Sequence, residues 1–99
     1  MNTLVIITPA AELDLAEALK WYDSIRPGLS IDFRLAFDAA ISRIGRYPCA
    51  NGVIEHGLRR ALLQRFSFAV FYRVWGEAVQ VIAVLHTSRS PLTWQSRSR

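Results

Sequence analysis

Apolar residues in the first 45 positions follow one strand-like run and then a helical repeat. Residues 4–7 are four consecutive apolar residues, a pattern typical of a short strand buried on both faces. Thr8 and Pro9 follow, and they favour a helix start, because threonine can cap the first turn and proline lacks an N–H that this turn leaves unpaired. The predicted helix carries an apolar stripe made of Ala11, Leu15, Ala18, Leu19 and Tyr22.

A second helix is predicted after the stop signal at Pro27-Gly28. It begins at Ser30 or a neighbouring residue, and Gly45, Pro48 and the Asn51-Gly52 pair end its pattern. Because only a short turn separates the two helices, they form a helical hairpin. The apolar positions of the second helix are Phe33, Phe37, Ala40, Ile41 and Ile44.

The second half of the chain changes to β-branched and aromatic runs, which predict strands at residues 58–66, 69–75 and 79–86. Short connections between these strands imply an antiparallel meander. We therefore expect an α+β fold with the order β-α-α-β-β-β, in which the helical hairpin packs on a small twisted antiparallel sheet. The first strand returns beside the meander, and the sheet face away from the helices stays polar.

The length of 99 residues suits one domain that spans residues 1–99, with a short Ser/Arg tail at residues 95–99 that we expect to fray. The apolar runs are too short to cross a membrane, and no charged-then-apolar leader precedes them. Cys49 is the only cysteine, which suits a reducing compartment. These features predict a soluble cytoplasmic protein. Since no glycine-rich phosphate loop, HExxH or CxxC motif is present, we expect no metal and no cofactor.

Charge is divided unequally along the chain. Residues 1–42 contain three basic and six acidic residues and carry −3, whereas residues 43–99 contain nine arginines and two glutamates and carry +7, which gives the net +4. Such a basic half can attract nucleic acid or an acidic protein segment, although general solubility explains the charge equally well. Arginine also favours planar, bidentate contacts over the point charge of lysine.

The arginines of the predicted strands are the main candidates for a binding or catalytic site, because guanidinium groups bind phosphate and stabilise its transition states. His86 ends the last strand, with Arg89 close after it, and could act as an acid or base. A structural role remains open for each: strand arginines can be solvated edge residues, and His86 can be a hydrogen-bonding residue at a strand end. Glu55 could be a base or an ion-pair partner. His56, next to Gly57 in a loop, is a weaker candidate than His86, and Cys49 is given no role. The strand arginines are Arg59, Arg60, Arg65 and Arg73, and we expect them to gather on the face of the sheet away from the helices.

Four segments resemble the RelE/ParE superfamily of type II toxins, and they occur in the family's order along nearly the whole chain. They are TPAAELDLAEALKWY, RPGLSIDFRLAFDAAISRIGRYP, GLRRALLQRFSFAVFYRV and VQVIAVLHTSRSPLTW. The resemblance implies the β-α-α-β-β-β fold expected above. It also implies a cognate antitoxin that wraps the toxin in a hetero-oligomer and blocks its action.

Members of the family that resemble RelE cleave messenger RNA on the ribosome, and members that resemble ParE inhibit DNA gyrase and serve in plasmid stabilisation. The RelE-like enzymes use a cluster of lysines and arginines with a late tyrosine or histidine. Here the only lysine is Lys20 and no tyrosine follows Tyr72, so we favour the ParE-like branch. A RelE-like nuclease stays open as an alternative, with Arg59, Arg65, Arg73 and His86 as its catalytic residues. A non-toxic relative that only binds its antitoxin is a third possibility. For contact with the target or the antitoxin, the candidates are the four strand arginines, Arg89 and Trp94.

Overall fold

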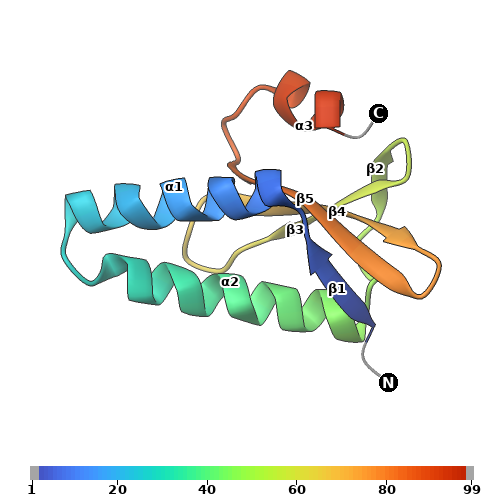
Figure 1. Ribbon diagram of the computed structural model, residues 1–99, viewed down its shortest axis with the longest axis horizontal. Helices are drawn as coiled ribbons and strands as arrows, with labels where there is room; N and C mark the ends of the chain where they lie inside the picture. Colours follow the sequence, from blue (N-terminus) through green and yellow to red (C-terminus); the bar gives the residue numbers. More distant parts are fainter. Residues whose placement is uncertain (1–2, 98–99) are drawn as a thin grey trace.

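The computed structural model describes residues 3–97 and has the predicted element order, with one extra strand and one extra helix (Figure 1). The α+β class and the β-α-α-β-β-β core are therefore confirmed. The additions are β2 and α3, which the sequence patterns did not reveal. The elements are β1 (Leu4–Ile7), α1 (Pro9–Ile25), α2 (Leu29–Arg46), β2 (Val53–Glu55), β3 (Leu58–Leu62), β4 (Phe68–Trp75), β5 (Ala78–His86) and α3 (Pro91–Arg97).

The helical hairpin begins and turns as the sequence indicates. The side chain of Thr8 accepts a hydrogen bond from the backbone N–H of Ala11 at 3.3 Å, and Pro9 is the first helical residue. Gly28 adopts a φ of 89° directly before α2, a conformation that glycine reaches without strain. Asp23 closes the turn, because its carboxylate accepts hydrogen bonds from the backbone N–H and the hydroxyl of Ser30 at 2.9 and 2.8 Å.

The five strands form one sheet in the order β1-β5-β4-β3-β2. Strands β3, β4 and β5 make the predicted antiparallel meander, and β1 returns beside β5 but runs parallel to it, so the sheet is mixed. The expectation that residues 4–7 are buried on both faces is wrong. Leu4 and Ile6 are exposed, because β1 is an edge strand that only the helices cover.

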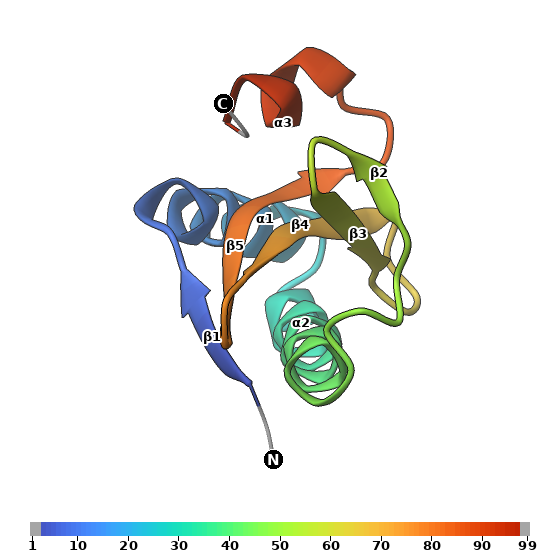
Figure 2. The same ribbon diagram turned by 90° about the vertical axis from the view of Figure 1, so that its right-hand side faces the viewer.

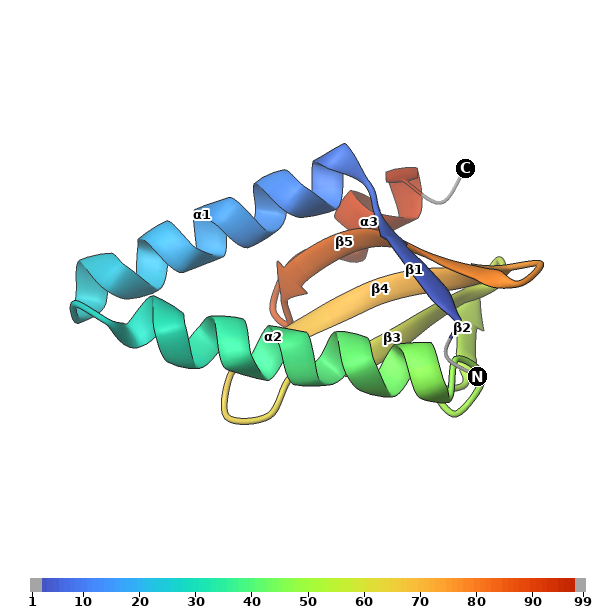
Figure 3. The ribbon, with the colours of Figure 1, turned by 60° about the horizontal axis from the view of Figure 1, so that its bottom comes forward.

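Helices α1 and α2 pack on one face of the sheet, which we call the helix face (Figures 1 and 3). The apolar stripes of both helices meet alternate residues of the strands there, as the 3.6-residue and two-residue periods require. Tyr22, Phe33, Phe66 and Phe68 pack together with ring centroids 5.0 to 5.9 Å apart. The largest fully buried side chains of this core are Tyr72, Phe33, Phe37, Ile44, Val70, Val79, Val81 and Val84.

The opposite face is not polar, and that expectation is wrong. It carries a second apolar cluster, which α3 covers; Figure 2 shows α2 below the sheet and α3 above it. The indole of Trp94 stacks on Phe71 with ring centroids 5.2 Å apart and an angle of 16° between the planes. Continuous apolar runs in β4 and β5 explain the difference, because such runs place apolar residues on both faces. The cluster comprises Leu58, Ala69, Phe71, Ile82, Ala83 and Leu85.

The expected frayed tail at residues 95–99 differs from the structure in its first three residues, which form the end of α3. Gln95 donates a hydrogen bond to Glu55 at 2.7 Å, and Arg97 forms a two-pronged pair with Asp14. These contacts hold the segment although its own composition is weak for a helix. Residues 98 and 99 lie outside the described residues.

Strand β3 ends at Leu62, four residues earlier than predicted. The backbone N–H of Leu63 still donates to Phe68 at 3.0 Å, but Arg65 has a φ of 72°, which belongs to a turn. In the described part of the chain, no helix is long and apolar enough to cross a membrane.

Candidate functional site

Arg59 and Arg60 point to opposite faces of the sheet, because adjacent residues of a strand alternate. Arg59 pairs with Tyr72 on the helix-face side, and its Nη1 donates to the backbone carbonyls of Asn51 and Cys49. The hydroxyl of Tyr72 also bonds this loop, donating to the carbonyl of Pro48 at 2.8 Å. Arg59 therefore holds the loop after α2, and its guanidinium group is engaged there.

Arg65 lies in the turn between β3 and β4, away from the other arginines of the strands. It is exposed, and its Nη2 lies 3.9 Å from a carboxylate oxygen of Asp32. An exposed pair at this distance contributes little to stability. Since the turn comes after the end of β3, Arg65 has no position in the sheet register.

Arg73 lies on the opposite face, where its Nε donates to the side chain of Gln80 at 3.1 Å. Its guanidinium carbon lies 5.6 Å from the ring centroid of Trp75. In the register, Arg73 is opposite Leu58 and Arg60 is opposite Phe71, so the two arginines are diagonal neighbours on one face. We call Arg60 and Arg73 the arginine pair.

The predicted gathering of Arg59, Arg60, Arg65 and Arg73 on one side is therefore wrong, since only the arginine pair shares a face. Alternation along β3 separates Arg59 from Arg60, and the early end of β3 removes Arg65. Whether any of these residues binds or reacts with a target stays a prediction.

His86 ends β5 on the helix-face side, and its ring meets Phe68 edge to face at 5.5 Å. Its Nδ1 accepts the backbone N–H of Ser88 at 3.0 Å and lies 2.7 Å from the Ser88 hydroxyl. Because a backbone N–H always donates, Nδ1 must be the accepting nitrogen, and the neutral ring carries its proton on Nε2. In this form His86 presents a donor, and its accepting nitrogen is already used.

The other candidates have structural contacts. Trp94 is half-buried on Phe71, and Glu55 accepts a hydrogen bond from Gln95 and lies 3.5 Å from His56. His56 has a φ of 50° in the tight turn between β2 and β3, a position that fits a turn residue. Within residues 3–97, no group of three or more His, Cys, Asp or Glu side chains could hold a metal ion. The expectation of no metal stays a prediction.

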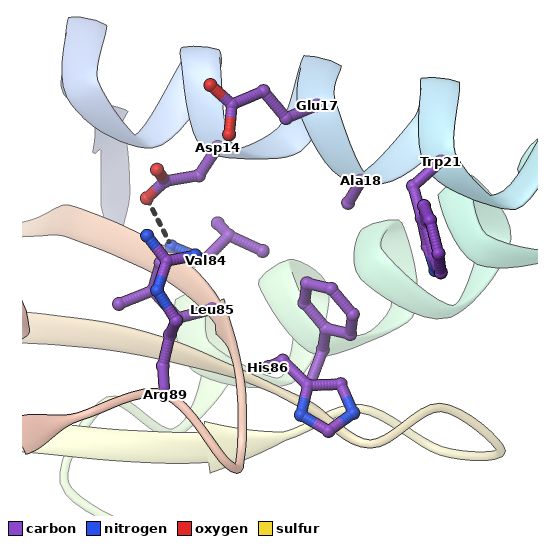
Figure 4. Close-up of a pocket in the computed structure, with 9 residues that line it drawn as sticks. Asp14, Glu17, Ala18, Trp21, Val84, Leu85, His86 and Arg89 are labelled. Atoms are coloured by element: carbon purple, nitrogen blue, oxygen red, sulfur yellow. Dashed lines mark hydrogen bonds between the residues drawn. The ribbon is translucent and has the colours of Figure 1, made fainter.

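A cleft of about 160 Å³ lies between α1 and the end of β5 (Figure 4). Asp14, Glu17 and Trp21 project from α1 on one side, and Arg89 reaches toward α1 from the loop on the other. We call it the α1–β5 cleft. Its floor is apolar and is formed by Ala18, Phe68, Val84 and Leu85, with His86 at one end.

Asp14 joins three elements beside this cleft. Its Oδ2 accepts the backbone N–H of Val84 at 3.0 Å, and its two oxygens bind the guanidinium group of Arg97, with 3.2 Å between Nη2 and Oδ1. The hydrogen bonds that Arg97 donates to Asp14 raise the pKa of Arg97 above its usual value. The register of β5 shifts nearby, because Phe71 faces Ala83 while Tyr72 faces Val81. The sequence does not reveal this role of Asp14, since a partner 70 residues away leaves no local pattern.

Comparison with known proteins identifies the family. The profile described as the ParE toxin of the type II toxin-antitoxin system, parDE, matches residues 5–91. The chain belongs to the ParE toxin family. Toxin ParE2 of two Mycobacterium tuberculosis strains, CDC 1551 / Oshkosh and H37Rv, is 34% identical over 82 residues, which cover 81% of this chain and 77% of the relative. This ParE-family chain is therefore the toxin component of a type II toxin-antitoxin system.

Two solved structures share the fold of this chain. A chain of the chromosomal ParDE system from P. aeruginosa superposes with a TM-score of 0.76 and 17% identity, over 85% of this chain and 95% of that chain. A chain of the toxin-antitoxin complex RelBE2 from Mycobacterium tuberculosis gives a TM-score of 0.60 and 17% identity, over 87% and 99%. At this identity the likeness shows the fold, which the ParE-family chain shares with both. Both neighbours come from toxin-antitoxin systems.

Proposed function

We propose that this ParE-family toxin arrests growth by binding DNA gyrase, without cleaving RNA. The proposal rests on family membership together with one observation: the residues that could form an RNA-cleaving site do not converge. Arg59 is engaged by the carbonyls of the loop after α2, Arg65 lies in a distant turn, and Arg73 is on the other face of the sheet.

Positioned charge is the main requirement for cleaving a phosphodiester, because the transition state gains negative charge on its equatorial oxygens. Guanidinium groups on opposite faces of a sheet cannot contact one phosphate together. The accepting nitrogen of the His86 ring, Nδ1, is also bonded to Ser88, so the neutral ring presents no free acceptor for a proton in this arrangement. These features favour an inhibitor that acts by binding its target, without a chemical step.

The opposite face offers a docking surface for gyrase or its bound DNA. Arg60 is exposed there, Arg73 lies beside it, and Trp75 is 68% exposed at the end of β4. Exposed aromatic residues and arginines are the groups that contribute most at protein interfaces. We infer that the arginine pair and Trp75 contact the target, and that the toxin acts in the cytoplasm, where gyrase works on the chromosome or a plasmid.

The test is a paired assay with the purified full chain. In the first arm, gyrase, DNA and ATP are incubated with increasing toxin, and we expect loss of supercoiling or accumulation of cleaved DNA. In the second arm, a translation reaction with the same toxin is analysed by primer extension, and we expect intact message. Cuts at codon positions together with normal supercoiling would instead identify a RelE-like nuclease. Inactivity in both arms, with no growth arrest on expression, would identify a non-toxic relative.

The variant Arg60→Glu and its matched control, Arg34→Glu, separate the docking surface from a general effect of charge. Arg34 is exposed on α2, where it pairs with Asp38 and its guanidinium carbon lies 6.0 Å from the ring centroid of Phe37. Both variants make the same change of charge at the surface. We expect Arg60→Glu to raise the toxin concentration for half inhibition of gyrase about tenfold and Arg34→Glu to leave it within twofold. Equal effects of the two variants would refute the assignment of the arginine pair.

A further inference from the structure

The flank of α1 that borders the α1–β5 cleft combines an exposed aromatic ring with acidic side chains. Trp21 is 61% exposed although it is a large apolar residue, and Glu17 lies one helical turn before it. A second, shallower hollow lined by Glu17, Lys20, Trp21 and Ser24 adjoins the cleft and shares two of its residues. Exposed aromatic residues beside a hollow with a polar rim are typical of an interaction surface.

The size of the cleft indicates what enters it. Its volume is about 160 Å³ and its floor is apolar, and a cavity of roughly 150 Å³ with apolar walls can accommodate a benzene ring. The cleft therefore fits one aromatic or branched aliphatic side chain. A metabolite of ordinary size needs a larger site, of about 300 to 1,000 Å³.

The charges beside the cleft indicate a basic neighbour for that side chain. Among the described residues, Asp14 is paired with Arg97 of the same chain, whereas Glu17 forms no hydrogen bond or ion pair. The flank thus already binds one guanidinium group in cis. Glu17 has only a longer-range electrostatic attraction to Arg97, so its carboxylate oxygens keep their hydrogen-bonding capacity for a second basic group in trans. Arg89 on the far wall can receive an acidic residue and so fix the direction of a bound segment.

We propose that the flank of α1 is the docking surface for the antitoxin, and that it receives a segment with an apolar anchor side chain next to a lysine or arginine. The anchor enters the α1–β5 cleft beside Trp21, and the basic residue binds Glu17. An amphipathic segment laid along a helix and its adjoining groove is a common mode of recognition. The basic neighbour is the reverse of the acidic segment that the net charge of the chain suggests, because the local charge of α1 is negative.

This proposal rests on membership of the toxin-antitoxin family and not on gyrase as the target. Its test measures the affinity of the full chain for its cognate antitoxin, so failure of the gyrase proposal leaves the result unaffected. Isothermal titration gives the dissociation constant for the parent chain and for two cleft variants, Glu17→Arg and Trp21→Ala. Failure of the parent pair to associate overturns the proposal together with its premise.

Each cleft variant has a matched control elsewhere on the surface. Glu77→Arg makes the same charge change in the exposed turn between β4 and β5, and Trp75→Ala removes an indole that is as exposed as Trp21. We expect each cleft variant to weaken antitoxin binding at least tenfold and each control to stay within twofold. Because all four side chains are exposed, the variants should keep the parent's circular dichroism spectrum.

The milder variant Glu17→Gln keeps the size of the side chain, and we expect it to weaken binding by about threefold, an effect that high salt should reduce. Three results overturn the proposal: cleft variants that bind within twofold of the parent, controls that weaken binding as much as cleft variants, and a loss confined to Glu17 or to Trp21 alone. The last result would contradict the paired anchor and basic residue.

Discussion

Both faces of the sheet are apolar, but different elements shield their side chains from water. On the helix face, two long helices bury a continuous core in which Phe33, Phe37 and Tyr72 have almost no exposed surface. On the opposite face, a seven-residue helix covers a smaller cluster and is held by one stacked indole and two side-chain contacts. The comparison teaches that the helix face determines the fold, while the opposite face depends on a segment with little structure of its own. Local stability should differ accordingly.

The largest expected loss of stability comes from removing a buried side chain of the helix face. Phe37→Ala removes a fully buried ring between α2 and the sheet, so we expect a loss of about 3–5 kcal/mol in the free energy of unfolding. Urea denaturation followed by circular dichroism measures it. The control is Leu35→Ala, on the exposed side of the same helix, which should change stability by less than about 0.5 kcal/mol. Similar values for the two variants would contradict the assignment of the core.

Asp14 connects the two faces, and its removal should have the next largest effect. Asp14→Ala leaves the backbone N–H of Val84 and the guanidinium group of Arg97 without their partner, so we expect a loss of about 2 kcal/mol. Arg97→Ala should cost less, because Asp14 then keeps its bond to Val84. Denaturation of both variants gives the comparison. Equal losses for the two variants would show that Asp14 stabilises the fold only through Arg97 of α3.

Trp94→Ala should affect the opposite face only. Loss of the stack on Phe71 frees α3, while the core of the helix face stays intact. We expect the amides of residues 91–97 to lose their protection from hydrogen exchange, and the midpoint of global unfolding to fall by an amount equivalent to about 1 kcal/mol. Hydrogen exchange followed by NMR measures the protection of each amide, and denaturation measures the midpoint of global unfolding. Loss of protection throughout β4 and β5 would mean that the faces unfold together.

The smallest expected effect lies outside both faces, at the turn of the helical hairpin. Hydrogen bonds from the backbone N–H and then the hydroxyl of Ser30 lower the pKa of Asp23. A lowered pKa in the folded state stabilises the protein above the ordinary carboxylate pKa, and this contribution is lost as the pH falls through the folded value. Ser30→Ala should raise the pKa of Asp23 only part of the way, because the backbone bond remains. An NMR titration of the Asp23 carboxyl carbon that finds no rise would exclude the role of the hydroxyl.

Sequence patterns predicted the parts of the fold whose signals are local. Proline and glycine mark the ends of α1 and the start of α2, and helical periodicity identified the residues that face the core. Strand β2 has only three residues, and α3 exists through contacts with distant residues such as Asp14 and Glu55, so neither has a pattern of its own. Sequence pattern and composition therefore fail to predict the secondary structure of segments that tertiary contacts stabilise.

The candidate site was harder to predict than the fold. Adjacent residues of a strand point to opposite faces, so the sequence alone was enough to predict that Arg59 and Arg60 lie on different faces of the sheet. The end of β3 before Arg65 was not predictable, because the sequence there continues without a strong break. The α1–β5 cleft brings together carboxylates of α1, the end of β5 and Arg89, and no single-sequence pattern contains that combination.

Direct binding to gyrase tests the central functional claim most directly. Purified full-length chain is titrated against purified gyrase at low and at high salt, with Arg60→Glu and Arg34→Glu in parallel. The account predicts saturable binding that salt weakens, that Arg60→Glu weakens about tenfold, and that Arg34→Glu leaves within twofold. Absence of saturable binding at micromolar concentrations of folded protein would contradict it.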